Sequence, residues 1–282
     1  MLIEGDHFFL NAELISTDVY SDFKYEQSRV VYEVIRVQEG IPLFFLRHIN
    51  RLKNSVQLLK ATHPDYDAII LLINKLIAVN QLLNKNIRLS LIYKEDFDRN
   101  PDVLITFIPS KYPSIRDIQS GISVRSINAC RETPNVKLEN KNLRELADDL
   151  IRSGNCYEVI LVDRNGCITE GSRSNIFFIQ GNEVFTSPAR TVLGGITREV
   201  VIEICENNGI RITEKGINVR DLPLLDGAFL TGTSPGVLPI AKFDNFSFQK
   251  GLKIQKKLVD EYTKFVEKDL NSFRNRDNNP IE

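Results

Sequence analysis

The sequence has few of the side chains that bind transition metals. It contains three histidines and four cysteines, and no two cysteines have the C-x-x-C spacing. Structural zinc sites are usually built from such side chains at short spacings, so we expect no metal site. Cysteines without a disulfide-type spacing are typical of a reducing compartment, where they remain free thiols.

An excess of charge of either sign is also absent. The 36 lysines and arginines stand against 37 aspartates and glutamates, which gives a formal net charge of -1. This near balance gives no support for a nucleic acid or an anionic membrane as a partner. No apolar run reaches about 18 residues, so no membrane span is expected. The opening residues L-I-E-G-D lack the basic and apolar regions of a signal peptide, and we expect a cytoplasmic protein.

Apolar periodicities of both strand and helix type occur along the 282 residues, a length that suffices for two domains. Strands are expected at 8–15, 30–37, 41–45, 86–93, 103–108, 122–127, 176–179, 184–186 and 228–230. Helices are expected at 67–79, at 141–153, from 193–198 up to Gly209, at 252–273, and where Ile49, Leu52, Val56 and Leu59 recur. Mixed elements in both halves predict an α/β (α+β) fold.

The segment P-S-K-Y-P-S at 109–114 is the best candidate for a domain boundary. Two prolines among polar residues are typical of a stiff, extended connector. We therefore expect an N-terminal α/β domain at 1–108, a linker at 109–119 and a C-terminal α/β domain at 120–282.

Two helices carry more detailed expectations. In the helix that contains Ile49, Arg51 is expected off the apolar face. The helix at 141–153 is expected to carry Leu143, Leu146, Leu150 and Ile151 on one face and to be closed by Gly154 as the residue after its end.

The stretch 159–175, V-I-L-V-D-R-N-G-C-I-T-E-G-S-R-S-N, predicts a hairpin with its turn at Asn165-Gly166. Its return segment carries one carboxylate, Glu170, among small residues. Small residues beside a carboxylate suggest that the backbone lies close to a ligand. An exposed glutamate on an edge strand is the simpler interpretation of these residues alone.

Three further places have the chemistry of a phosphate site. Gly194 to Thr197 stand at the expected start of a helix, where backbone N–H groups and the helix dipole favour an anion, although Thr197 also suits a plain N-cap. Thr231-Gly232-Thr233-Ser234 follows an apolar strand and groups hydroxyls around a glycine. Arg51 could grip a phosphate with two N–H groups, although a solvated arginine on a helix is the simpler interpretation. Lys137 and Lys141 are equal candidates for a reactive amine by chemistry alone.

Taken together, these segments resemble the fold-type IV pyridoxal-phosphate enzymes. This family holds the branched-chain aminotransferases, the D-amino-acid aminotransferases and 4-amino-4-deoxychorismate lyase. The matching segments, between about residues 25 and 240, are Y-E-V-I-R-V-Q-E-G-I-P-L, R-H-I-N-R-L, V-K-L-E-N, Y-E-V-I-L-V-D, I-T-E-G-S-R-S-N-I-F, V-F-T-S-P, G-G-I-T-R and F-L-T-G-T-S-P-G-V-L-P-I. The block 157–198 is the most specific part.

The resemblance implies a two-domain enzyme with pyridoxal 5′-phosphate in the interdomain cleft, and a homodimer. It selects Lys137, three residues before Asn140, as the lysine that bonds to the cofactor and moves the proton at the substrate Cα. Glu170 would pair with the protonated pyridine nitrogen. The other implied cofactor-binding residues are Arg51, Ile196, Thr197 and Thr233 at the phosphate, Asn175 and Leu193 beside the ring, and Tyr25 near the lysine or phosphate.

Two parts of the chain depart from the family pattern or bear on the substrate. The segment Gln27-Ser28-Arg29-Val30 stands where family members usually have F-G-D-G, which alters the shape expected on the substrate side. The segment N-I-R-L at 86–89 is similar to the branched-chain type, and this makes Arg88 a candidate for binding a substrate carboxylate.

The resemblance implies an aminotransferase that acts on an amino acid and a 2-oxo acid. The lyase that converts aminodeoxychorismate to 4-aminobenzoate and pyruvate is the alternative on the same scaffold. A non-catalytic relative that only binds cofactor or a partner is a third hypothesis, against which the retention of Lys137 and Glu170 argues.

Overall fold

The computed structural model describes residues 2–22, 28–94, 97–249 and 251–278. The chain divides into two compact units. The first consists of residues 1–111, 136–139 and 269–282, and the second of residues 112–135 and 140–268.

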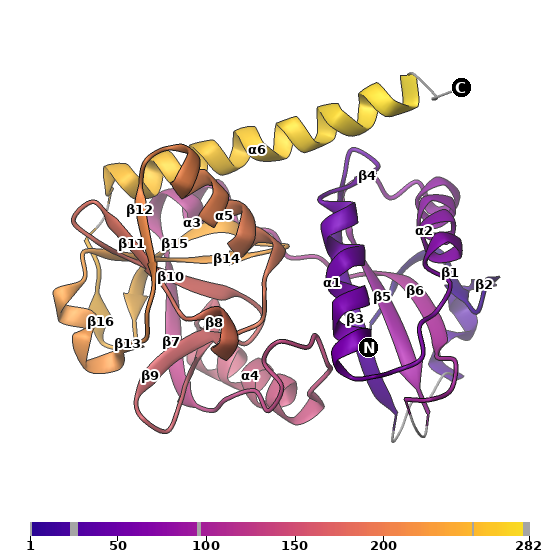
Figure 1. The fold of residues 1–282 in the computed structure, drawn as a ribbon, viewed down its shortest axis with the longest axis horizontal. Coiled ribbons are helices and arrows are strands. Elements are labelled where there is room, and N and C mark those ends of the chain that lie inside the picture. The colour runs from indigo at the N-terminus through magenta and orange to yellow at the C-terminus, as the bar shows by residue number, and fades with distance from the viewer. Residues whose placement is uncertain (1, 23–27, 95–96, 250, 279–282) are drawn as a thin grey trace. The chain divides into compact units, whose positions relative to one another are not determined.

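The first unit is built on a six-stranded sheet in the order β2-β1-β6-β5-β3-β4 (Figure 1). Its strands are β1 (Glu4–Leu10), β2 (Glu13–Ser16), β3 (Arg29–Gln38), β4 (Ile41–Pro42), β5 (Asn86–Tyr93) and β6 (Asp102–Ile108), and each pairs antiparallel with its neighbours. The expectation of one strand at 8–15 is wrong. Asn11 and Ala12 have positive φ and turn the chain between β1 and β2, so this apolar run with a polar break is a hairpin.

Two helices cover one face of this sheet. They are α1 (Phe45–Leu58) and α2 (Tyr66–Asn80), and a short helix, η1 (Thr17–Asp22), follows β2. The apolar residues of α1 and α2 share one buried core with those of the sheet, including Ile49, Leu52, Ile73, Val31 and Leu89. The helical periodicity of the sequence is thereby confirmed at both places.

The segment 136–139 adds a short extended stretch to the edge of β3. The N–H of Tyr32 donates to the Lys137 carbonyl at 3.1 Å, and the N–H of Glu139 donates to the Val30 carbonyl at 2.9 Å. Leu138, between them, packs into the core on the helix side of the sheet. Because side chains alternate along extended backbone, Lys137 and Glu139 belong to the opposite face.

The second unit contains a ten-stranded mixed sheet in the order β12-β11-β10-β14-β15-β7-β8-β9-β13, with β16 paired to β15. Its strands are β7 (Ile122–Asn128), β8 (Glu158–Val162), β9 (Cys167–Gly171), β10 (Asn175–Gln180), β11 (Glu183–Thr186), β12 (Arg211–Glu214), β13 (Ile217–Asn218), β14 (Gly227–Gly232), β15 (Gly236–Phe243) and β16 (Phe246–Ser247). Pairing is parallel for β11 with β12, β15 with β7 and β7 with β8.

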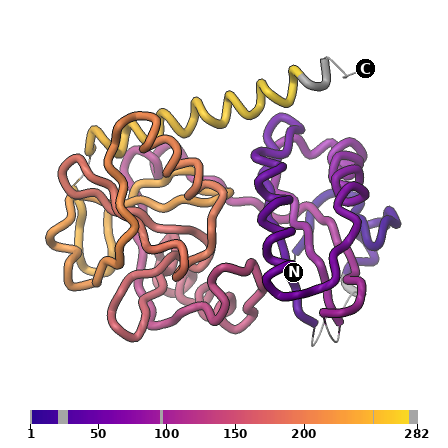
Figure 2. Tube along the Cα trace, viewed as in Figure 1, coloured from indigo at the N-terminus to yellow at the C-terminus, as the bar shows by residue number. Residues whose placement is uncertain are grey.

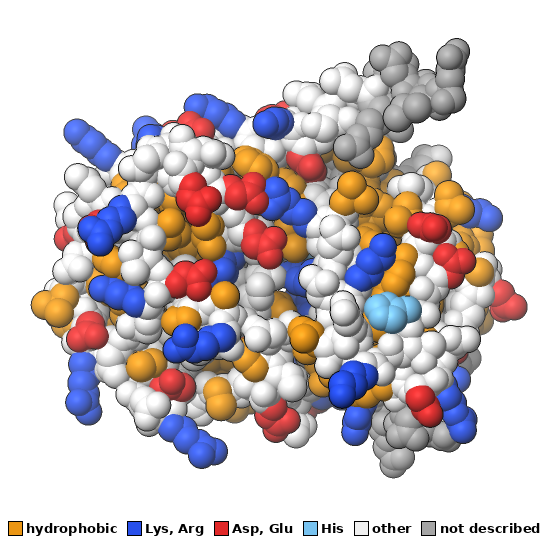
Figure 3. Space-filling model, viewed as in Figure 1, with side chains coloured by type: hydrophobic (Ala, Val, Ile, Leu, Met, Phe, Trp, Pro, Cys, Tyr) orange, Lys and Arg blue, Asp and Glu red, His pale blue; other side chains and the backbone are white. Residues whose placement is uncertain are grey.

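The remaining helices are α3 (Ile115–Ser120), α4 (Lys141–Gly154), α5 (Ile196–Asn207), α6 (Lys253–Asn278), η2 (Ala189–Thr191) and η3 (Val219–Leu224). The last of them in the chain, α6, is the long yellow helix in Figure 2. Within the described residues, no helix combines the length and the apolar character needed to span a membrane. In the face shown in Figure 3, acidic and basic side chains are interspersed.

The hairpin turn at Asn165-Gly166 is confirmed. Gly166 has a φ of 78°, and the Asp163 carboxylate accepts hydrogen bonds from the N–H groups of Asn165 and Cys167. An acceptor that holds two turn N–H groups fixes the register of β8 and β9. This register sets where Glu170 falls along β9.

The expectation that Gly154 closes α4 is wrong. Asn155, rather than Gly154, has the left-handed conformation after the helix, with a φ of 45°, because asparagine tolerates this region without a glycine. Leu146 is 49% exposed, and the fully buried residue on this side is Ala147.

Candidate active site

A buried carboxylate on β3 holds two basic residues of α1. Glu33 accepts hydrogen bonds from Arg51 Nε at 2.8 Å and Arg51 Nη2 at 2.6 Å, and His48 Nδ1 lies 2.8 Å from its Oε2. Burial alone would raise the pKa of Glu33, but the charge and hydrogen bonds of Arg51, with those of His48, outweigh it and bring the pKa to about 2. The carboxylate is therefore ionised at neutral pH and fixes the guanidinium in a bidentate geometry.

The interpretation of Arg51 as a solvated side chain is wrong, because its side chain is only 11% exposed. Sequence reasoning missed Glu33. A signal for it was present: Glu33 occupies the inward position between Val31 and Ile35 in β3, and a carboxylate at such a position requires a cationic partner.

Lys137 lies in the same unit as this group. Its Nζ is 4.9 Å from the centre of the Tyr32 ring. Burial lowers the pKa of His48, and the positive charge of Lys137 contributes to the same direction. Lys141, in contrast, is an exposed residue at the start of α4. The two lysines therefore differ in their surroundings, one beside an aromatic ring and the other exposed.

Arg88, on β5, contacts the same aromatic ring. Its Nε donates to Ser90 Oγ at 3.0 Å, its Nη2 donates to Glu139 Oε1 at 2.9 Å, and its guanidinium stands 4.2 Å from the centre of the Tyr32 ring. The candidate for binding a substrate carboxylate therefore already has a carboxylate partner.

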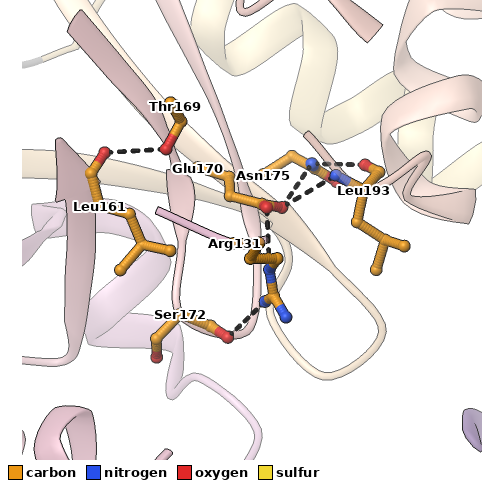
Figure 4. A network of polar contacts seen from close by, with 7 residues as sticks. All are labelled: Arg131, Leu161, Thr169, Glu170, Ser172, Asn175 and Leu193. Carbon is orange, nitrogen blue, oxygen red and sulfur yellow. Dashed lines mark hydrogen bonds and ion pairs between the residues drawn. The ribbon is translucent and has the colours of Figure 1, made fainter. Parts of the chain in front are cut away.

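In the second unit, Glu170 is the centre of a polar network (Figure 4). Its side chain is buried, with 2% exposed, so the interpretation as an exposed strand glutamate is wrong. Glu170 Oε1 lies 2.9 Å from Arg131 Nε, and Oε2 accepts from the Leu193 N–H at 3.2 Å and from Asn175 Nδ2 at 3.5 Å. Arg131 Nη2 donates in addition to the Ser172 carbonyl.

The backbone next to Glu170 is held by a second buried carboxylate, Glu158 of β8. Its oxygens accept from Ser172 Oγ at 2.7 Å and Ser174 Oγ at 3.2 Å. Burial raises the pKa of Glu158 above its ordinary value. A Cβ on Gly171 would come within 2.1 Å of Ser174 Oγ, so the small residues of the E-G-S-R-S-N stretch are explained by this close packing.

Asn175 connects this network to the start of α5. Its Nδ2 donates to the Leu193 carbonyl at 2.9 Å, and its Oδ1 would be 2.0 Å from a Cβ added at Gly195. Gly195 is the N-cap of α5 and has no side-chain cap hydrogen bond. The interpretation of Thr197 as a plain N-cap is therefore wrong. A helix start without a side-chain cap can bind an anion with its N–H groups.

The end of β14 lies beside the same residues, since Asn175 of β10 pairs with Thr231 of β14. Thr231 Oγ1 is buried and has no hydrogen-bond partner within the described residues. Thr233 follows two residues later and is partly exposed. The second unit thus groups Glu170, Asn175, Leu193, Ile196, Thr197 and Thr233.

Not every predicted site residue can be placed. Tyr25 and Gln27 lie outside the described residues. Arg51, Lys137 and Arg88 belong to the first unit, and the remaining predicted residues belong to the second. Arg131 was missed because nothing in A-C-R-E-T-P marks its partner.

Chemically, these groups suit a ligand that is both anionic and basic. An uncapped helix start and an orphan hydroxyl can receive phosphate oxygens, and a buried carboxylate can keep a proton on a heteroaromatic nitrogen. A lysine on an aromatic face can supply an amine to an aldehyde. The residues present therefore fit the phosphate, ring nitrogen and aldehyde of pyridoxal phosphate.

Comparison with known proteins supports this fit to pyridoxal phosphate. A family model described as amino-transferase class IV matches residues 30–243. A probable branched-chain-amino-acid aminotransferase of Thermotoga maritima is 29% identical over 263 residues, 88% of this chain and 89% of that protein. D-alanine aminotransferase of Bacillus licheniformis is 28% identical over 243 residues, 82% of this chain and 84% of that protein.

Solved structures share the fold. A branched-chain amino acid aminotransferase of Escherichia coli superposes with a TM-score of 0.80 at 23% identity, covering 93% of this chain and 95% of that one. Another branched-chain amino acid aminotransferase, solved with pyridoxamine 5′-phosphate, has a TM-score of 0.81 at 20% identity, covering 94% and 95%. A structure described as a putative 4-amino-4-deoxychorismate lyase of Legionella pneumophila has a TM-score of 0.74 at 20% identity, covering 85% of this chain and 91% of that one.

Proposed function

The chain belongs to the class IV aminotransferase family, and from this premise we propose how its residues act on an amino acid and a 2-oxo acid with pyridoxal 5′-phosphate as cofactor. The observation that carries the proposal is the buried Glu170, held at both oxygens by Arg131, Leu193 and Asn175. Burial of a carboxylate costs free energy, and the three groups that hold Glu170 keep it in one orientation, as a partner for a protonated ring nitrogen would require.

In the first unit, Arg51 and Lys137 are the residues proposed to touch the cofactor. Arg51 donates hydrogen bonds from Nε and Nη2 to Glu33. The guanidinium is therefore fixed before a phosphate binds, and binding costs little side-chain entropy. Lys137 is proposed to bond to the cofactor and then to accept and return the proton at the substrate Cα.

In the second unit, the Glu170 carboxylate is proposed to hold a proton on the pyridine nitrogen. When bound, the cofactor supplies an electron sink for the substrate Cα, provided that its nitrogen stays protonated. Arg131 keeps the carboxylate in place, while Asn175 and Leu193 flank the ring. The backbone at Ile196 and Thr197, with Thr233, is proposed to receive the phosphate. The role expected for Tyr25 stays a prediction, since this residue lies outside the described residues.

We further propose that the chain divides near 109–119 and that the protein is a homodimer in a reducing cytoplasm. Support for the compartment is that all four cysteines are free thiols, of which Cys156 and Cys205 are buried.

The lyase is not favoured, because the curated relatives are named as aminotransferases. A screen of amino donors against a set of 2-oxo acids, read as formation of the new 2-oxo acid, tests the proposal. Visible absorbance of the purified protein should show bound cofactor. Release of pyruvate from aminodeoxychorismate without an added 2-oxo acid, and no amino transfer in the screen, would instead identify a lyase.

A further inference from the structure

The ion pair between Arg88 and Glu139 is not used by the reaction as proposed. Both residues lie in the first unit, their side chains are 11% and 22% exposed, and Arg88 Nη2 stands 2.9 Å from Glu139 Oε1. The Nε of Arg88 is also occupied, by Ser90. Within the described residues, Nη1 of Arg88 and Oε2 of Glu139 form no hydrogen bond.

This pair lies next to the lysine proposed to be catalytic. The Arg88 guanidinium and Lys137 Nζ stand 4.2 Å and 4.9 Å from the centre of the same Tyr32 ring. Glu139 follows Lys137 by two residues on an extended segment, so the two side chains share a face. A substrate held at Lys137 would therefore lie close to the Arg88–Glu139 pair.

The charge of Arg88 is cancelled at close range. A lone guanidinium here would attract a second carboxylate of a substrate, and the neighbouring Glu139 carboxylate weakens that attraction. The second oxygen of Glu139 also places negative charge there. It would repel a second carboxylate of a substrate, and such repulsion discriminates strongly against that class of substrate.

We propose that Glu139 is a specificity-determining residue: by pairing with Arg88, it makes the site favour amino acids and 2-oxo acids with a single carboxylate over those with two. This inference rests on the proposed function, because it concerns the substrate of that same site. Arg88 then binds the side-chain end of the substrate rather than the carboxylate that all amino acids share.

The test uses the holoenzyme with one neutral amino donor and two acceptors, pyruvate and 2-oxoglutarate. Wild type should have the higher kcat/KM with pyruvate. Glu139→Gln keeps the size of the side chain and frees the charge of Arg88, and it should raise the ratio of kcat/KM for 2-oxoglutarate over pyruvate by on the order of tenfold. The double variant Arg88→Gln/Glu139→Gln should return the ratio to that of wild type, since the cation that causes the gain is gone.

A binding measurement that needs no turnover separates this inference from the proposed function. Glutarate and valerate have the same chain length and differ by one carboxylate. By calorimetry, Glu139→Gln should bind glutarate on the order of tenfold tighter than wild type, with valerate unchanged. If no acceptor supports amino transfer, the proposed function fails, while this measurement still decides the role of the pair.

Glu13→Gln, which removes an exposed carboxylate from β2 of the same sheet, is the matched control. It should change neither the kcat/KM ratio of the two acceptors nor the affinity for glutarate relative to valerate. Glu139→Ala gives a second variant in which no amide can hold Arg88 in its present position. If the Glu139 variants raised kcat/KM equally for both acceptors, Arg88 would bind the carboxylate common to all substrates, and the proposal would be overturned. A wild-type preference for 2-oxoglutarate would do the same.

Discussion

Arg131 Nε and Glu170 Oε1 form a largely buried ion pair, 2.9 Å apart, with side chains 14% and 3% exposed. Arg131 also donates to the carbonyl of Ser172, which follows Glu170 closely in the chain. The guanidinium therefore ties the carboxylate to the backbone that follows it. The other oxygen, Oε2, is directed towards Asn175 and Leu193, so both carboxylate oxygens are held in place.

Glu170→Gln should reduce turnover on the order of a hundredfold or more, equivalent to about 3 kcal/mol of barrier. The amide keeps the size of the side chain but loses the charge that holds the proton on the ring nitrogen. Cofactor affinity should change much less, because the phosphate contacts remain. Steady-state kinetics and cofactor titration measure the two effects. Glu183→Gln, which removes the carboxylate of an exposed pair with Arg211, is the control and should be near wild type; near-normal transamination by Glu170→Gln itself would refute the assigned role.

Borohydride reduction followed by peptide mapping should place the pyridoxyl group on Lys137. Lys137→Ala should lose turnover by several orders of magnitude, since both the covalent link and the proton transfer at the substrate Cα depend on this amine. Lys141→Ala should keep its activity, because Lys141 is an exposed residue at the start of α4. A pyridoxyl label on Lys141 would reverse this assignment.

Glu33→Gln should lower the free energy of unfolding by about 3–5 kcal/mol, because it leaves the Arg51 charge largely buried without its partner. The pH dependence gives an independent check. The pKa of Glu33 is lowered from 4.5 to about 2 on folding, so the pair contributes stability above the unfolded pKa and loses it as the pH falls through the folded one. Wild type should lose this contribution between about pH 5 and pH 2, whereas Glu33→Gln should show a shallower acid transition. Equal slopes for the two proteins in denaturant melts across this range would count against an ionised Glu33.

Gly195→Ala should weaken cofactor binding and destabilise the second unit by about 1–3 kcal/mol. Its Cβ would stand 2.0 Å from Asn175 Oδ1, which must then move away from Leu193 and Glu170. Gly194→Ala is the control for stability, because the Cβ added there meets its nearest neighbour, Glu199, at an ordinary 3.7 Å. Thermal melts of the two variants measure the difference, and equal melting temperatures would show that the loop adapts at no cost.

The local elements of the site could be predicted from the sequence because their signals are local. The Asn165-Gly166 turn, the strand that carries Glu170 and the glycines before α5 each depend on residues that are neighbours in the chain. The assignment of Lys137 over Lys141 required the family resemblance, since both lysines precede or begin the same helix.

The partners of these residues could not be predicted, because they come from distant parts of the chain. Glu33 and Arg51 are 18 residues apart, and Arg131 and Glu170 are 39 apart. Hydrophobic periodicity contains no information about ion pairs between distant residues. For Glu33 alone, the free-energy cost of burying an unpaired carboxylate indicates that a cationic partner exists. The exposure of Leu146 was missed for a similar reason, since helical spacing fixes which residues share a face but not which edge of that face is covered.

The order in which the first unit can be completed during synthesis follows from its discontinuous sequence. The edge of β3 that the segment 136–139 covers remains open until a further stretch of chain beyond 111 has been made. The carboxylate of Asp269, which accepts the N–H of Phe44 at 2.8 Å, comes later still. An open strand edge is a site for pairing with other chains. A nascent or truncated polypeptide that ends after residue 111 thus has an uncovered strand edge and lacks Lys137. The addition of segment 136–139 therefore both covers the edge of the sheet and supplies the lysine proposed to react.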